Sequence, residues 1–422
     1  MTAKKNLFIR WLNKIPPQVI VLVAILFVAI ICRVWLLGQP SAYVYDEVYY
    51  VKYAKMFLSG KYWIDVHPAL GDVIIAIGIK IFGDHSWAWR LLAALAGIAI
   101  IPLSYSIASR IFKNRWIGVI TAFLLTFDGL MLVQSRTALL DIFMTFFVLC
   151  AYFFYLKYRE KQNLAFLAAC GLTLGLALAT KWVAAPFWII IIGWFIWDTR
   201  KTPRRLWWGL LFLIILPAAI YILSFLLYRR RGAESFWAYL KYWHIRTLKF
   251  HYYLRSPHAY ESRWYTWPIL YQPVWYLKTE MSDGTVSAIV TLGNPLIWLT
   301  SIIAFFYSIY LLFFKRFYAV LIPLLSFSLF YFSWAVIKRP EFVYYIVPAL
   351  PFYFMLCAFF IMNIYKKYKI IGAILLIAVA AFFLFFYPIA INRPISQTYM
   401  KSMIWLKSWQ IKPDKNATTS IN

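Results

Sequence analysis

Two adjacent carboxylates, Asp46 and Glu47, follow the first long apolar run of the chain directly, within Tyr45-Asp46-Glu47-Val48-Tyr49-Tyr50. Ionised groups at a membrane surface are costly unless they are paired, solvated or used. A solvated charge pair is the simpler interpretation of an isolated Asp-Glu. A second cluster, Asp65-Val66-His67-Pro68, follows on the same side of the membrane. Alone, it could be a turn that caps a helix.

Three cations lie at membrane depth or at its edge: Arg90, Arg136 and Lys181. For each one alone, a side chain that reaches back to the interface is as reasonable as a functional role. Asp128 and Asp141 flank Arg136 and could pair with it. Taken together with the acids, the cations predict a polar pocket that opens to the outer surface.

Carboxylates, cations and many aromatic residues suit the transfer of a sugar from a lipid phosphate. A hydroxyl acceptor is a weak nucleophile and needs a carboxylate as general base. A phosphate leaving group needs Arg or Lys to stabilise the charge that develops on it. The sequence contains both residue types but does not by itself bring them together.

The composition requires that these groups be positioned by membrane helices. Of 422 residues, 64% are hydrophobic and only 14% charged, against roughly 25% charged in soluble domains. The net charge of +28 would suggest nucleic acid in a soluble protein, but here the basic residues separate apolar runs, so no nucleic-acid partner is expected. We predict an all-α polytopic membrane protein with about 11 transmembrane helices. The predicted spans lie near 18–37, 88–109, 116–133, 138–156, 164–183, 184–198, 206–228, 294–314, 317–337 and, as two helices, 343–388.

The basic residues predict the orientation, because short cytoplasmic loops carry an excess of Lys and Arg. With the N-terminus inside, all acids except Glu160 and Asp198 fall on the outer side or at its edge. Residues 1–388 then form one membrane domain with external loops at 38–87 and 229–293, and residues 389–422 form an external tail. In these loops, 70–84 predicts a re-entrant or interfacial segment, and 234–253 predicts an amphipathic helix on the outer interface with its basic face toward lipid phosphates.

The order and spacing of the motifs resemble the protein O-mannosyltransferase family, over about residues 40 to 360. The motifs are Asp46-Glu47, Asp65-Val66-His67-Pro68, Arg90, Asp128-Gly129, Ser135-Arg136, Leu139-Leu140-Asp141, Thr180-Lys181-Trp182, His258-Ala259-Tyr260-Glu261-Ser262, Trp267-Pro268, Pro273-Val274, Gly293-Asn294-Pro295 and Arg339-Pro340-Glu341-Phe342 with Tyr344-Tyr345 and Pro348.

The resemblance implies a GT-C glycosyltransferase fold and the transfer of mannose, with inversion, from polyprenyl- or dolichyl-phosphate-mannose to Ser or Thr of a translocated polypeptide. It also implies contact with membrane lipids and association with the Sec translocon. Asp46 would be the general base, and Glu47 would support it or position the acceptor. The resemblance assigns the donor phosphate to Arg90 and Lys181, with Arg339 as a weaker candidate. Asp65, His67, Arg136 and Asp141 would line the site, and His258 and Trp267 would help to close it.

The chain departs from the family at Ala69 and Asp72, where a second Pro and a Lys or Arg are usual, and at Gln272, where Arg is frequent. The loop at 229–293 is too short for the β-trefoil (MIR) domain of eukaryotic members. This favours a bacterial or archaeal protein of the plasma membrane, or of the endoplasmic reticulum membrane if the source is eukaryotic.

Two alternative functions stay open. The same fold and donor could serve a lipid or cell-wall glycan acceptor, as in transferases that place aminoarabinose on lipid A. A transporter of lipid-linked sugar is the third hypothesis, although it predicts inverted repeats that the sequence lacks. No cofactor is predicted, and metal dependence stays open, because Asp46, Glu47 and His67 could bind Mg²⁺ or Mn²⁺. The four cysteines lie in apolar spans and indicate no disulfide framework, and Asn416-Ala417-Thr418 matches a glycosylation sequon.

Overall fold

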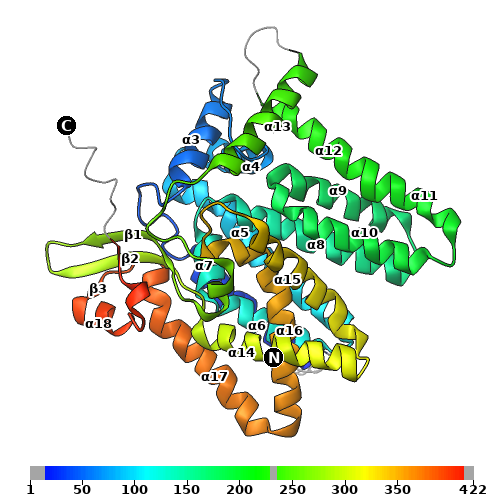
Figure 1. The fold of residues 1–422 in the computed structure, drawn as a ribbon. Helices are drawn as coiled ribbons and strands as arrows, with labels where there is room; N and C mark the ends of the chain where they lie inside the picture. Colours follow the sequence, from blue (N-terminus) through cyan, green and yellow to red (C-terminus); the bar gives the residue numbers. More distant parts are fainter. Residues whose placement is uncertain (1–14, 229–234, 413–422) are drawn as a thin grey trace, which may run out of the picture.

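The computed structural model describes residues 15–228 and 235–412, which are mainly helical (Figure 1). The predicted sequon at Asn416 lies outside the described residues. The α-helices are α2 (Pro17–Val34), α3 (Glu47–Leu58), α4 (Leu70–Phe82), α5 (Ser86–Ile111), α6 (Arg115–Thr126), α7 (Gly129–Arg136), α8 (Leu140–Lys161), α9 (Leu164–Thr180), α10 (Ala185–Thr199), α11 (Leu206–Gly209), α12 (Leu216–Ser224), α13 (Phe236–Tyr253), α14 (Pro295–Phe314), α15 (Leu321–Ser333), α16 (Leu350–Lys367), α17 (Lys369–Phe386) and α18 (Gln397–Ser402).

In the part of the chain that the structure describes, nine helical segments are long and apolar enough to cross a membrane. Two further predicted spans differ from them. The run 116–133 is broken, because α6 and α7 meet at an angle of 65°, and α9 has only 17 residues. A bent pair and a slightly short helix that packs along α8 both remain compatible with a crossing. The predicted polytopic helical fold is confirmed.

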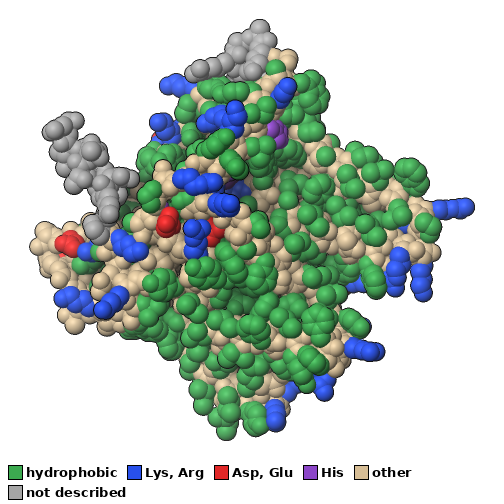
Figure 2. All heavy atoms as spheres, in the orientation of Figure 1, with side chains coloured by type: hydrophobic (Ala, Val, Ile, Leu, Met, Phe, Trp, Pro, Cys, Tyr) green, Lys and Arg blue, Asp and Glu red, His purple; other side chains and the backbone are tan. Residues whose placement is uncertain are grey.

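The buried fraction of each segment shows whether it lies at the centre or at the edge of the helix bundle. The apolar window of α16 is 89% buried, whereas those of α2 and α17 are 22% buried. An apolar helix in lipid needs no polar face, so the exposed apolar side chains of α2 and α17 fit a lipid-facing position. Figure 2 shows hydrophobic side chains over most of the visible face, with Lys and Arg gathered over α3 and α13 and at the far tips of the helices.

The break between α6 and α7 has a clear physical cause. The Asp128 side chain accepts a hydrogen bond from the Met131 backbone N–H and so caps α7. Its second oxygen accepts bonds from the backbone N–H of Asn294 and from Nε1 of Trp298, at 2.9 and 2.8 Å. Gly129 permits the close approach, because an added Cβ would lie 2.4 Å from the Leu292 carbonyl oxygen. Asp128 therefore joins α7 to the start of α14 and does not pair with Arg136.

Residues 38–87, predicted to be the first external loop, contain α3 and α4, and α13 lies over them. The Trp243 indole of α13 donates a 2.9 Å hydrogen bond to the Asp65 backbone carbonyl, and Trp243, Trp63 and Tyr228 form part of a small separate hydrophobic cluster. The predicted helix at 234–253 is thus confirmed as α13. Its exposed face carries large apolar residues such as Trp237 and Tyr252.

A small sheet between α13 and α14 was not predicted. Strands β1 (Val274–Glu280) and β2 (Thr285–Thr291) form an antiparallel hairpin with Val274 opposite Thr291, and β3 (Ile395–Ser396) pairs with β2. The β-branched run of β2 and the Asp283-Gly284 turn carried the signal, but the all-α prediction overlooked it. The tail is attached here, since Met400, Met403 and Trp409 belong to the same buried core as the helices.

Candidate active site

Asp46 lies at the turn that starts α3, with its carboxylate partly exposed. The preceding residue, Tyr45, has a φ of 51°, which turns the backbone sharply between buried Val44 and the helix. Non-glycine residues rarely adopt this conformation, and it is enriched at functional sites. Among the described residues, no side chain or backbone group hydrogen-bonds to the Asp46 carboxylate. Asp46 therefore presents an uncommitted base.

The charges that act on Asp46 come from three other parts of the chain. Burial raises the pKa of Asp46 to about 6, Lys181 and Arg339 lower it, and Asp141 raises it. A carboxyl group with a pKa near the working pH is well suited to accept a proton, because it is ionised yet retains basicity. The structure thus brings together predicted site residues that are far apart in the sequence.

Lys181 and Asp141 form a buried ion pair at the ends of adjacent antiparallel helices. Lys181 directly follows α9 and Asp141 is in the first turn of α8, so both lie at the same end of the pair. The Nζ of Lys181 is 2.8 Å from an Asp141 carboxylate oxygen, and the side chains are only 9% and 6% exposed. Asp141 therefore pairs with Lys181, not with Arg136 as the sequence had suggested.

Arg339 joins the site from the loop before α16 and contacts α13. Its guanidinium lies 2.6 Å from Nδ1 of His251 and donates a 2.5 Å hydrogen bond to the Tyr345 hydroxyl. Its Nε has no hydrogen-bond partner among the described residues although it is buried. A cation that keeps an unused donor is suited to bind an added anion.

Two histidines stand beside these cations. The rings of His67 and His251 have centroids 6.1 Å apart. Burial lowers the pKa of His251 to about 4, with Arg339 adding to the effect, and the pKa of His67 is also well below its usual value because of burial and nearby Lys181. Both imidazoles are therefore neutral near neutral pH. Nδ1 of His251 accepts from Arg339, and the His251 ring also hydrogen-bonds to the Val66 backbone, so only His67 can donate a further hydrogen bond without adding charge. Sequence reasoning found His67 but missed His251, whose only signal was its place on the amphipathic helix.

Glu47 and Arg90 form a second, fully buried ion pair, which the sequence analysis did not predict. The guanidinium donates to both Glu47 oxygens, at 2.8 and 2.7 Å, and to the backbone carbonyls of Leu37, Pro40 and Ala42. All five of its N–H donors are used, and Arg90 is 1% exposed. No N–H donor of Arg90 therefore remains for a donor phosphate in this arrangement, which favours a structural role for this residue.

Glu47 holds the backbone turn that carries Asp46. Its carboxylate also accepts hydrogen bonds from the backbone N–H of Val44 and of Ala138, both at 2.9 Å. These bonds tie the turn that carries Asp46 to Arg90 and to the start of α8. The predicted supporting role of Glu47 thus fits the structure, whereas direct contact with an acceptor does not, because Glu47 is fully buried.

Arg136 was predicted to line the site, but its guanidinium is engaged at the end of α2 instead. Its guanidinium donates to four backbone carbonyls at the end of α2, those of Cys32, Arg33, Trp35 and Leu36. Helix ends leave such carbonyls without partners, and Arg136 supplies the missing donors. The cation therefore stabilises the end of α2 and the start of the segment that follows it.

Asp65 is buried beside the site, and one of its oxygens accepts a bond from the Val66 N–H. Burial raises the pKa of Asp65 to about 7, while the Val66 N–H and then Lys181 lower it. Trp267 is buried and packs against Tyr331, Trp334 and Tyr345, so it supports the Arg339 side of the site without facing it. His258 is exposed and contacts Phe342.

Three tyrosines that were not assigned a role, Tyr45, Tyr276 and Tyr344, lie close enough to Asp46 to feel its charge. Tyr45 stacks on Tyr276 of β1 at 4.2 Å and meets Tyr344 edge-on at 5.8 Å. The Gln134 amide donates a 2.7 Å hydrogen bond to the Tyr276 hydroxyl. The hairpin thus contributes part of the wall of the site, which sequence reasoning could not place because the hairpin itself was missed.

No group of three or more His, Cys, Asp or Glu residues in the described ranges could hold a metal ion. Of the predicted trio, Glu47 is already engaged by Arg90 and by two backbone N–H groups. The trio therefore does not converge on one point.

The chain resembles known proteins along nearly its whole length. A family model described as dolichyl-phosphate-mannose-protein mannosyltransferase matches residues 23–85 and 80–240, and one described as the C-terminal four TMM region of protein-O-mannosyltransferase matches residues 236–409. A polyprenol-phosphate-mannose–protein mannosyltransferase of Mycobacterium tuberculosis is 26% identical and aligns over 88% of this chain and 87% of its own. A relative of the same description from Corynebacterium glutamicum is 25% identical, over 83% and 82%.

Solved structures show the same fold. The Saccharomyces cerevisiae protein O-mannosyltransferase Pmt1-Pmt2 complex bound to the sugar donor superposes with a TM-score of 0.82 at 14% identity, over 94% of this chain and 93% of that chain. ArnT from Cupriavidus metallidurans bound to undecaprenyl phosphate gives 0.61 at 20% identity, over 86% and 63%. These likenesses confirm the predicted GT-C fold. Since the family models together cover most of the chain, it belongs to the dolichyl-phosphate-mannose-protein mannosyltransferase family.

Proposed function

We propose that this chain transfers mannose from a polyprenyl- or dolichyl-phosphate-mannose to Ser or Thr hydroxyls of a polypeptide, with inversion at the sugar carbon. The observation that carries the proposal is the uncommitted Asp46 carboxylate, with its pKa raised to about 6, under the influence of Lys181 and Arg339. The names of the curated relatives, which are polyprenol-phosphate-mannose–protein mannosyltransferases, support the donor and the acceptor.

In the proposed step, the acceptor hydroxyl gives its proton to Asp46 while its oxygen forms a bond to C1 of the mannose. The bond between C1 and the phosphate oxygen breaks, and its electron pair stays on the phosphate. Asp46 is needed because an alcohol is a poor nucleophile until its proton is removed. The attack on the face opposite the phosphate inverts the configuration. The products are the mannosylated polypeptide and the polyprenyl phosphate.

The donor phosphate would lie against Lys181 and Arg339, with His67 as a neutral hydrogen-bond donor. The departing phosphate gains negative charge, and fixed cations stabilise that charge more in the transition state than in the ground state. Lys181 is already paired with Asp141, which holds its ammonium in place. Arg339 is the cation with a buried unused N–H.

The setting of the reaction is also part of the proposal. Asp46 and Lys181 lie where α3 begins and α9 ends, on the face that the positive-inside pattern assigns to the outside. The acceptor would therefore be a polypeptide that has crossed the membrane, delivered by the Sec translocon. We place the protein in the plasma membrane, with its N-terminus inside.

An in vitro transfer assay tests this function. Purified full-length protein in detergent is given polyprenyl-phosphate-mannose and a Ser/Thr peptide, with a peptide in which every Ser and Thr is Ala as control. Mass spectrometry should find added hexose only on the hydroxyl-bearing peptide. Separate reactions offer lipid A or a cell-wall glycan as acceptor, and polyprenyl-phosphate-aminoarabinose as donor. Transfer only to those acceptors, or no transfer to any acceptor, would contradict the proposal.

A further inference from the structure

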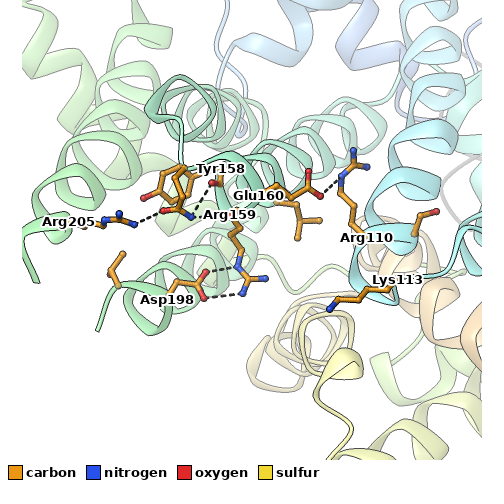
Figure 3. Close-up of a pocket in the computed structure, with 11 residues that line it drawn as sticks. Arg110, Lys113, Tyr158, Arg159, Glu160, Asp198 and Arg205 are labelled. Atoms are coloured by element: carbon orange, nitrogen blue, oxygen red, sulfur yellow. Dashed lines mark hydrogen bonds and ion pairs between the residues drawn. The ribbon is translucent and has the colours of Figure 1, made fainter. Parts of the chain in front are cut away.

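A polar cavity, shown in Figure 3, lies at the ends of α5, α8 and α10. On α8 this is the end opposite to the one that carries Asp141. Its volume is about 590 Å³, and it is lined by the last turns of α5, α8 and α10 and by Arg205 before α11. Helix α8 links the two sites, because Asp141 is in its first turn and Arg159 in its last. Their 18 positions correspond to about 27 Å at 1.5 Å per residue, close to the thickness of a bilayer core.

The carboxylates in this cavity are already neutralised. Arg159 forms a two-pronged pair with Asp198, with N···O distances of 2.7 and 3.1 Å. Glu160 is paired with Arg110 at 3.0 Å and with Lys157 at 3.5 Å. The carbonyl ends of α5, α8 and α10 also attract cations, which helps to explain why Arg110 and Arg159 are held here.

Two cations in the lining have no carboxylate partner among the described residues. Lys113 follows the end of α5, and Arg205 donates only to the neutral amide oxygen of Gln162. Both lie beyond the helix ends, and they extend toward the cavity from opposite sides (Figure 3). The cavity thus keeps two positive charges that its own acids do not balance.

The surroundings of the cavity are those of a lipid interface. Its lining residues come from the ends of four segments that are apolar enough to cross a membrane, which include α5, α8 and α10. On α10, Ile196 and Trp197 expose 51% and 63% of their surfaces beside the cavity-lining Asp198. Tryptophan and basic residues at this level are typical of the headgroup region, and basic pockets between the ends of membrane helices bind anionic headgroups.

We propose that this cavity binds the phosphate of an anionic phospholipid such as phosphatidylglycerol, through Lys113 and Arg205. The acyl chains would lie along the exposed apolar surface of α10. The site is separate from the sugar-transfer site and does not depend on the identity of the donor or acceptor. Free phosphate shares the same chemistry, but the position at the membrane edge and the adjoining apolar surface favour the lipid.

Native mass spectrometry of the full-length protein in detergent tests the proposal by titration with phosphatidylglycerol and, separately, phosphatidylcholine. The test variant is Lys113→Gln with Arg205→Gln. The control, Lys315→Gln with Arg316→Gln, removes one Lys and one Arg that are also exposed and lie between α14 and α15, outside the cavity. All four side chains are exposed, and thermal unfolding curves confirm that both variants fold. A third variant, Lys113→Arg, keeps the charge.

We expect wild type and the control to bind phosphatidylglycerol more tightly than phosphatidylcholine. The test variant should lose about tenfold or more in affinity for phosphatidylglycerol alone, and Lys113→Arg should retain it. Equal binding by the test and control variants would overturn the proposal. Displacement of the lipid by millimolar glycerol 3-phosphate, with equal affinity for the soluble anion, would also overturn it, because the cavity would then be a site for free phosphate.

Discussion

Replacing Asp46 by Asn should lower the activity and at the same time raise the stability of the fold. Asparagine keeps the size and the position at the start of α3 but cannot accept the proton of the acceptor hydroxyl. Loss of a general base typically slows a reaction by about 10²- to 10⁴-fold, which corresponds to about 3–5 kcal/mol in the activation barrier. Donor binding should change little, because Lys181 and Arg339 remain.

The same change should stabilise the fold. The pKa of Asp46 is raised from 3.8 to about 6, so ionisation costs free energy in the folded state that it does not cost in the unfolded chain. That cost is complete above about pH 6 and disappears below the unfolded pKa near 3.8. With allowance for partial exposure of the carboxylate, Asp46→Asn should gain about 1–2 kcal/mol of stability at about pH 8.

The assay measures transfer of hexose to a Ser/Thr peptide by mass spectrometry, donor affinity by titration, and the midpoint of thermal unfolding, all in one detergent. Asp283→Asn is the control, because Asp283 lies in the exposed hairpin turn away from the site. Turnover of Asp46→Asn within about tenfold of wild type would remove Asp46 as the base. A lower unfolding midpoint would show that ionised Asp46 has a stabilising partner and would refute the electrostatic reasoning.

Three further predictions follow from the site. Arg90→Ala leaves Glu47 buried without its cation, so it should destabilise the protein by about 3–5 kcal/mol, seen as a lower unfolding midpoint. Arg339→Gln should instead keep the unfolding midpoint of the wild type. It should weaken donor binding by about tenfold to a hundredfold, which corresponds to the loss of one charge-assisted hydrogen bond. If Arg90→Ala were stable but had lost its affinity for the donor, these two assignments would be reversed. The pH profile of kcat/KM should rise about tenfold per pH unit up to about 6 and then level, since only ionised Asp46 accepts the proton. A profile that stays flat from about pH 5 to 8 would exclude a base with that pKa.

Much of the architecture could be predicted from the sequence because the bilayer imposes a simple length and composition rule on helices. The broken span at Asp128 and the short α9 were both recognised as membrane runs, although their bend and length appear only in three dimensions. The β1–β2 hairpin was missed. A short alternating strand pair is a weak signal beside long apolar runs, and its contribution to the wall around Asp46 was lost with it.

The sequence by itself determined the class of protein, the family likeness and the residue types at the site, because composition, span length and motif order are local properties of the chain. Only the tertiary structure decided which charges meet. Glu47 pairs with Arg90, 43 residues away, Asp141 pairs with Lys181, and Arg136 satisfies the end of α2. Charge pairing depends on the distance between groups and on their burial, neither of which can be read along the chain. These pairings leave Asp46 with an uncommitted carboxylate under the influence of Lys181 and Arg339.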